Sequence, residues 1–130
     1  MTTREQAQAT VDGYLAAYNT DDPDALVALF TDDAVFIDPV GTPAHVGPAA
    51  IRAFWDAVHE LSPHIELRPE MITICGNEVA LVMEIHAGGL ILDAVDIFDL
   101  DDTGRIVGLK AYWDMDRART PAPEPGPPGA

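Results

Sequence analysis

The hydropathy pattern changes its period once along the chain, and this change constrains the fold more than any other feature. Before about residue 63 the apolar residues recur at helical spacing, and from His64 onward they alternate with polar residues, as in strands with one buried face. The connections between the later segments are short and carry turn residues, such as Gly76-Asn77 and Gly88-Gly89. Strands joined by such short loops must be antiparallel. The pattern therefore predicts an α+β fold, with helices gathered on one face of the sheet.

Capping residues and prolines set the boundaries of the predicted elements. Thr3 and Gln6 have the spacing of a capping box, which starts the first helix. Asp22-Pro23 joins a helix cap to a proline at the first helical position, and Pro48 opens a third helix in the same way. The sequence predicts helices over 4–19, from 23 to about 31 and over 48–61, and strands over 34–38, 64–74, 79–87, 90–100 and 105–114.

Length and composition indicate a single globular domain followed by a proline-rich tail. A chain of 130 residues with an apolar share of 48% is long enough to bury one core. Residues 1–119 are predicted to form this domain. The tail, 120–130, contains five prolines and no core residue, so it is predicted to be disordered.

The charge balance argues against several classes of partner, although an excess of acidic residues can also serve solubility alone. The chain has 22 acidic and 7 basic side chains, a formal net charge of −15, which repels phosphate backbones and anionic lipid. We therefore expect no nucleic-acid or membrane partner and favour a neutral, apolar small molecule. Cys75 is alone, so no intrachain disulfide can form, and no apolar run approaches the ~20 residues of a membrane span. These features and the lack of a signal-peptide core predict a cytoplasmic protein.

One acidic residue stands out in the predicted strand over 90–100. Residues two apart in a strand share a face, so Asp96 lies on the face of Leu92, Ala94 and Phe98. A carboxyl among apolar side chains resists ionisation, and in its protonated form it can donate a hydrogen bond to a developing oxyanion. The structural alternative is that the Asp96 side chain faces water at the mouth of the sheet.

Two further polar residues occupy predicted buried or turn positions. Tyr14 lies on the apolar stripe of the first helix, and Asp38 ends the first strand directly before Pro39. Each has an ordinary alternative, a core tyrosine for the one and a turn-capping aspartate for the other. The four histidines show no spacing typical of metal ligands, and the sequence has no glycine-rich phosphate loop. We therefore expect neither a metal nor a cofactor.

Taken together, these residues resemble the bacterial steroid Δ5-3-ketoisomerases. The resemblance covers nearly the whole chain except the tail, and its specific part is Tyr14, Asp38 followed by Pro39, and Asp96. The wider pattern, including Leu29-Phe30, is shared with the broader NTF2-like, or SnoaL-like, superfamily. The resemblance implies a cone-like fold in which three N-terminal helices pack on a curved, mostly antiparallel sheet, usually as a homodimer.

The resemblance also implies an activity and assigns roles to residues. The implied enzyme is an isomerase that moves a C=C bond from Δ5 to Δ4 of a 3-oxosteroid without a cofactor. Asp38 would be the general base, while Tyr14 and protonated Asp96 would donate hydrogen bonds to the C3 oxygen. The expected substrate contacts are apolar or aromatic side chains of the helices and the sheet: Tyr18, Phe54, Trp55, Val58, Met83, Ile85, Leu109 and Trp113.

Two other functions are open on the same fold. One is an enzyme of another chemistry, such as a polyketide cyclase or an epoxide hydrolase, and the other is a non-catalytic module for ligand binding or dimerisation. Hydrolysis would need a water held by an arginine-linked carboxylate. Arg52, Arg68 and Arg105 fall at the edges of predicted elements, which disfavours that arrangement.

Overall fold

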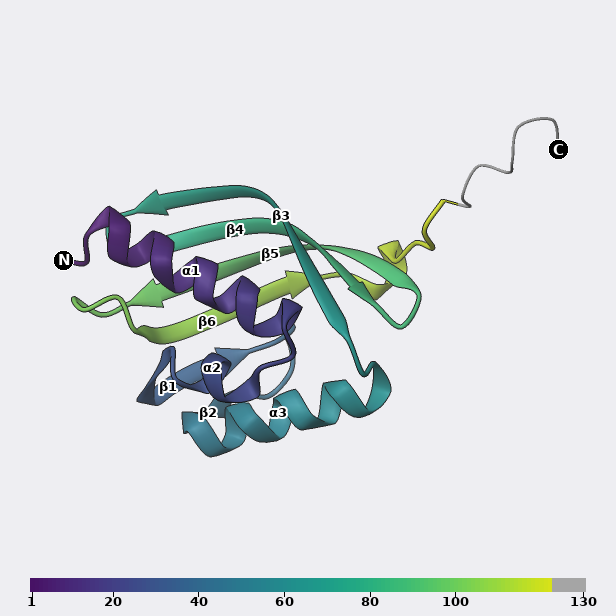
Figure 1. The fold of residues 1–130 in the computed structure, drawn as a ribbon, viewed down its shortest axis with the longest axis horizontal. Helices are drawn as coiled ribbons and strands as arrows, with labels where there is room; N and C mark the ends of the chain where they lie inside the picture. The colour runs from purple at the N-terminus through teal and green to yellow at the C-terminus, as the bar shows by residue number, and fades with distance from the viewer. Residues whose placement is uncertain (123–130) are drawn as a thin grey trace, which may run out of the picture.

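The computed structural model describes residues 1–122, which form helices packed against one face of a six-stranded sheet (Figure 1). The helices are α1 (Arg4–Asn19), α2 (Pro23–Val27), α3 (Gly47–Leu61) and the short 3-10 helix η1 (Met115–Arg117). The strands are β1 (Phe30–Ile37), β2 (His45–Val46), β3 (Ile65–Cys75), β4 (Glu78–Ala87), β5 (Leu90–Leu100) and β6 (Ile106–Trp113). The predicted α+β fold is confirmed. Most of the predicted tail, residues 123–130, lies outside the described residues.

The sheet is mostly antiparallel, with one parallel pair. Its strand order is β2-β1-β6-β5-β4-β3, and β3 to β6 follow one another as an antiparallel meander. β1 runs parallel to β6, with Phe36 opposite Leu109. Figure 1 shows the sheet curving so that the start of β3 reaches the end of α3, while α1 lies across the concave face. The parallel pair brings the end of β1 beside the end of β6.

The capping box predicted for α1 is present and fixes the start of the helix. The Thr3 side chain accepts a hydrogen bond from the Gln6 backbone N–H at 3.1 Å, and the Gln6 side chain accepts one from the Thr3 backbone N–H at 2.8 Å. From this start, the buried face of α1 carries Val11, Tyr14 and Tyr18 toward the sheet. The two tyrosines therefore lie one turn apart above the concave face.

The structure corrects the prediction for the segment that follows α1. α2 ends at Val27 instead of near residue 31, and β1 covers Phe30–Ile37 instead of 34–38. The cause is a distant strand: the Ile106 N–H donates to the Leu29 carbonyl at 2.8 Å, and the pairing with β6 then draws the next residues into the sheet. The two-residue strand β2 was not predicted, because two residues are too short to show a periodic pattern.

The core lies between the helices and the concave face of the sheet. Its largest fully buried side chains include Phe30 and Phe36 of β1 and Phe98 of β5. Tyr14 closes the other side of this cluster, with its ring 5.1 Å from that of Phe98. Among residues 1–122, no helix has the length and apolar character needed to cross a membrane.

Candidate active site

A cavity of about 110 Å³ between the helices and the concave sheet face brings the three predicted catalytic residues together. α1 supplies Tyr14, the end of β1 supplies Asp38, and the middle of β5 supplies Asp96. The other lining residues are aromatic or aliphatic: Tyr18, Phe54, Val58, Ile65, Leu67, Met83, Ile85, Leu92 and Trp113. A few polar groups therefore converge inside a mostly apolar wall, the arrangement expected of a site for a small apolar ligand.

Most of the predicted substrate contacts lie in this wall, and two do not. Trp55 is buried behind Tyr18, with the two ring centroids 4.6 Å apart, and does not line the cavity. Leu109 pairs with Phe98 in the core, and it precedes Trp113 on β6 by four residues. Three wall residues, Ile65, Leu67 and Leu92, were not among the predicted contacts. For Leu92 the signal was present, because strand alternation places it on the face of Asp96.

The Asp96 carboxyl is buried without a partner. It is 1% exposed, and neither of its oxygens accepts or donates a hydrogen bond within the described residues. Burial raises the pKa of Asp96 to about 8, with the negative charge of Asp38 acting in the same direction and the nearby Tyr14 hydroxyl acting against them. At neutral pH the group is therefore mainly protonated, and its proton is free to be donated to a ligand.

The Asp38 carboxyl has a different environment. Its Oδ1 accepts a hydrogen bond from the Trp113 indole N–H at 2.7 Å. Burial raises the pKa of Asp38 above its usual value, and this hydrogen bond and the charge of His45 offset part of the rise. Because Asp38 has a donor that stabilises its ionised form and Asp96 has none, Asp38 is the carboxyl of the pair that ionises first. Of the two carboxyls in the cavity, Asp38 is therefore the one suited to act as a base and Asp96 the one suited to act as a donor.

The two cavity tyrosines are neutral donors. Burial raises the pKa of Tyr14 well above its usual value, and the charges of Asp96 and Asp38 add to the rise. Tyr18 is affected in the same direction, with Asp38 contributing more than Asp96. Both hydroxyls therefore keep their protons throughout the physiological pH range and can donate hydrogen bonds.

The raised pKa of Asp96 is expected to make folding stability depend on pH. The carboxyl ionises near pH 4 in the unfolded chain but only near pH 8 in the folded chain. Between these two pH values the folded state holds a proton that the unfolded state has lost. The stability that Asp96 contributes to the folded state is therefore fully present below about pH 4. The free energy of unfolding then falls by up to about 1.4 kcal/mol per pH unit as the pH rises to about 8. Chemical denaturation should show a steeper decline for the native protein than for Asp96→Asn. Parallel profiles would contradict the raised pKa.

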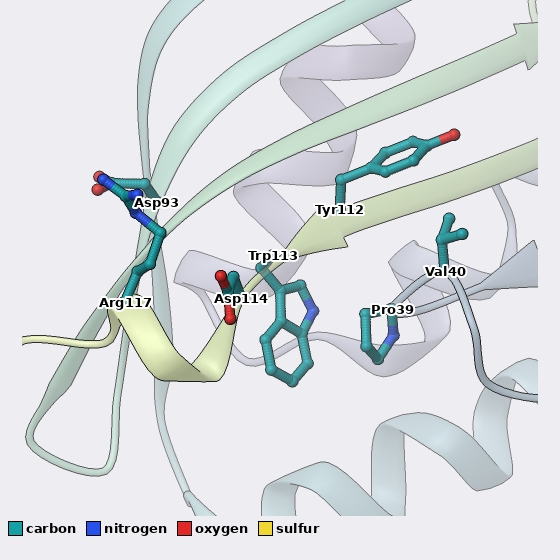
Figure 2. A pocket seen from close by; sticks show the side chains of 7 residues that line it. All are labelled: Pro39, Val40, Asp93, Tyr112, Trp113, Asp114 and Arg117. Atoms are coloured by element: carbon teal, nitrogen blue, oxygen red, sulfur yellow. The ribbon is translucent and has the colours of Figure 1, made fainter.

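A second hollow lies on the other side of Trp113. It has a volume of about 430 Å³, and Figure 2 shows it between the end of β6, the Pro39-Val40 turn and η1, with Asp93 and Arg117 at its edge. Its charged members are exposed, so none has the buried environment that would perturb its chemistry. The reactive groups converge in the smaller cavity, and we assign the site there.

A group of three carboxylates on the surface is arranged closely enough for a cation. Glu70, Glu84 and Asp93 place ligand atoms within 4.8 Å of one another. Arg119 already bridges two of them, with 2.7 Å to Glu84 and 2.7 Å to Asp93. The guanidinium therefore offsets part of this charge, and Glu84 and Asp93 act as its ion-pair partners.

Comparison with known proteins places the chain in a family. Residues 11–109 match the SnoaL-like domain family. A steroid Δ-isomerase of Nocardioides simplex is 29% identical over 120 residues, which cover 90% of this chain and 98% of that enzyme.

Solved structures of enzymes share the fold. SalBIII, an epoxide hydrolase/cyclase-like enzyme with a role in forming the pyran ring of the polyether salinomycin, is 25% identical with a TM-score of 0.84, over 92% of this chain and 99% of SalBIII. A Sinorhizobium meliloti protein assigned as a polyketide cyclase is 27% identical with a TM-score of 0.71, over 79% of this chain and 93% of that protein. The matched family and the observed fold agree: the chain belongs to the SnoaL-like family, within the NTF2-like fold.

Proposed function

We propose that this chain is an isomerase that moves a C=C bond into conjugation with a ketone, as in the Δ5 to Δ4 conversion of a 3-oxosteroid. The observation that carries the proposal is the pair of carboxyls in one apolar cavity: Asp38 hydrogen-bonded and ready to ionise, Asp96 protonated and unpartnered. Proton transfer next to a carbonyl requires such a base and such a donor. The similarity to the Nocardioides simplex steroid Δ-isomerase supports the same reaction.

The proposed reaction moves one proton from C4 to C6 and shifts the C=C bond with it. The Asp38 carboxylate takes a proton from C4, and the electrons of that C–H bond form a dienolate with negative charge on the C3 oxygen. Tyr14 and Asp96 donate hydrogen bonds to this oxygen, which stabilises the charge as it develops. Asp38 then returns the proton to C6, so that the substrate is isomerised and each side chain regains its starting state.

The volume of the cavity limits how much of a substrate it holds. An apolar cavity of about 150 Å³ is known to accommodate benzene, so about 110 Å³ corresponds to roughly one six-membered ring. We propose that the ring bearing the ketone enters the cavity beside Tyr14 and Asp96. The rest of a larger substrate then extends past the half-buried Val58 and Ile85, toward the open end of the sheet.

The proposal is tested with purified protein and 5-androstene-3,17-dione, by following the absorbance of the conjugated enone. Turnover above the uncatalysed rate is expected. A steroid that binds the cavity but is not isomerised would show that the reaction is wrongly assigned, while a steroid that does not bind would contradict the substrate class.

Replacing Trp113 with phenylalanine is expected to shift the pH dependence of the reaction. The change removes the indole N–H that donates to Asp38 at 2.7 Å, so the ionised carboxylate loses a stabilising partner and the pKa of Asp38 rises. A hydrogen bond to a charged group contributes about 1.5–3 kcal/mol, equivalent to about one to two pH units. In the pH profile of kcat/KM, the midpoint of the acid limb should therefore shift to a higher pH by that amount.

Trp55→Phe is the matched control for this shift. It removes a second buried indole, which packs on Tyr18 and does not contact Asp38. The acid limb should stay in place in that variant. An equal displacement in both variants would refute the role of the hydrogen bond.

A different reaction on the same fold is favoured by the similarity to SalBIII, an epoxide hydrolase/cyclase-like enzyme. An arginine-supported water would suit hydrolysis, but no arginine lines the cavity among residues 1–122. Arg52 instead pairs with Asp24 at 2.9 Å and with Asp56 at 3.2 Å. Hydrolysis of a cyclic epoxide by the protein, without isomerisation of the enone, would favour this second candidate. The homodimer and the cytoplasmic location stay predictions of the sequence.

A further inference from the structure

The chain stays on the sheet after β6 has ended. β6 ends at Trp113, opposite Ala94 of β5, and the chain then returns to β5 through η1. The Ile91 N–H donates to the Arg119 carbonyl at 2.7 Å, and the Arg119 N–H donates to the Ile91 carbonyl at 3.0 Å. We call residues 114–119 the C-terminal strap, because they pair with the part of β5 that β6 does not reach.

The Arg119 side chain fastens the strap to two strands. Its Nη1 donates to Asp93 Oδ2 of β5 and its Nη2 to Glu84 Oε2 of β4, each at 2.7 Å. Strand alternation puts both carboxylates on the face of the sheet away from the cavity, directly opposite one another in register, where like charges repel. The other Glu84 oxygen, Oε1, lies 2.9 Å from His86 Nε2. The planar guanidinium therefore joins the strap to both strands and offsets the repulsion between their carboxylates.

Trp113, the residue before the strap, is not held in place by side-chain packing alone. Its indole lines the cavity on one side and the hollow of about 430 Å³ on the other, so it lacks packing partners on both. Figure 2 shows the ring between Pro39 and Asp114, the first residue of the strap. The hollow gives the indole room to turn away from Asp38. The 2.7 Å hydrogen bond to Asp38 therefore depends on the backbone that flanks Trp113, which is β6 on one side and the strap on the other.

We propose that Arg119 is a positioning residue: it anchors the strap on β4 and β5, and the anchored strap keeps the Trp113 indole turned toward Asp38. This role rests on the proposed function and deepens it, because it adds a device outside the cavity that controls the base inside it. When the anchor is lost, the strap is released and the indole can enter the hollow, so the Asp38 carboxylate is left without its donor. Arg119 does not line the cavity, and its effect on the reaction passes through Trp113.

Arg119→Gln tests the anchor, since it removes both ion pairs and keeps a polar side chain. In the pH profile of kcat/KM, the midpoint of the acid limb should shift to a higher pH by about 0.5–1 unit, because two partly exposed ion pairs contribute free energy equivalent to up to about one pH unit. In the Trp113→Phe background, the same change should shift the limb no further. Additive shifts, or an acid limb in Arg119→Gln that matches the native one, would overturn the proposal.

Arg52→Gln is the matched control for this shift. The Arg52 guanidinium also binds two carboxylates, those of Asp24 and Asp56, and its side chain is exposed to nearly the same extent, 44% against 42% for Arg119. Its partners lie on α2 and α3, so the acid limb should stay in place. An equal shift in both variants would assign the effect to lost surface charge and overturn the proposal. The other titratable groups that act on Asp38 are unchanged in all these variants: His45, Asp96, Tyr14 and Tyr18.

Fluorescence separates the role of Arg119 from the proposed reaction, because it needs no turnover. The chain has two tryptophans, so in a Trp55→Phe background the emission comes from Trp113 alone. Arg119→Gln should increase the quenching of this emission by acrylamide, as the indole enters the hollow, and Arg52→Gln should leave it unchanged. Increased quenching in a protein that does not isomerise the enone would support the strap and reject the isomerase. Isomerisation with quenching unchanged by Arg119→Gln would overturn the role of Arg119 and leave the isomerase intact.

Discussion

Asp38→Asn is expected to lower kcat by about 10²- to 10⁴-fold, the range typical of a lost general base. The amide has nearly the same shape as the carboxyl, and its oxygen can still accept the indole N–H of Trp113, so the fold and the cavity should persist. The amide cannot take a proton from carbon at neutral pH. Turnover is measured by absorbance of the conjugated enone, and integrity of the fold by thermal unfolding.

The matched control is Asp33→Asn, which removes a carboxyl from the exposed face of the same strand, β1. This variant should keep native turnover, since Asp33 does not line the cavity. Full activity in Asp38→Asn would remove the base from the proposed mechanism. A loss of similar size in both variants would point to an effect on the fold or on overall charge instead of on the chemistry.

Asp96→Leu is expected to lower kcat by about 10²- to 10³-fold, as for removal of one donor from an oxyanion site. Asp96→Asn should have a smaller effect, because its amide N–H can still donate to the substrate oxygen. The native enzyme should also lose activity as the pH rises above about 8, where Asp96 ionises, and the asparagine variant should not. The comparison requires kcat for both variants between pH 6 and about 9.5, a range chosen around that pKa.

Asp99→Asn provides the control for this pair. Asp99 lies on β5 three residues after Asp96, but on the exposed outer face of the sheet. Equal losses in Asp96→Asn and Asp96→Leu would contradict a donor role, because only the first variant can donate. A basic limb near pH 8 that survives in Asp96→Asn would assign that limb to another group.

The sequence predicted the local parts of this structure well. The strands β3 to β6 begin and end within about one residue of their predicted limits, because alternation and turn residues are read from neighbours along the chain. The same alternation placed Asp96 on the buried face of β5, where the structure has it. What it did not predict is β2, which is too short to show a pattern, and the early part of β1, where Phe30 pairs with Ile106, a residue remote in the chain.

In the candidate site too, local patterns predicted some features, and contacts between distant parts of the chain determine the others. Alternation predicts which face a residue takes but not its depth along the strand, and so Leu109 was expected in the cavity although it lies in the core. The hydrogen bond between Trp113 and Asp38 joins residues 75 positions apart. It follows from the parallel register of β1 and β6, which no local pattern encodes.

The parallel pairing of β1 with β6 also bears on the synthesis of the protein. β1 lies near the start of the chain, yet its neighbour in the sheet, β6, is the last strand to leave the ribosome. Until then the inner side of β1 has no partner, and Asp38 has no indole beside it. Contacts so distant in the chain close late and slow the final folding step. During synthesis, the Asp38 carboxyl therefore gains its hydrogen-bond donor only after residue 113 has been added to the chain.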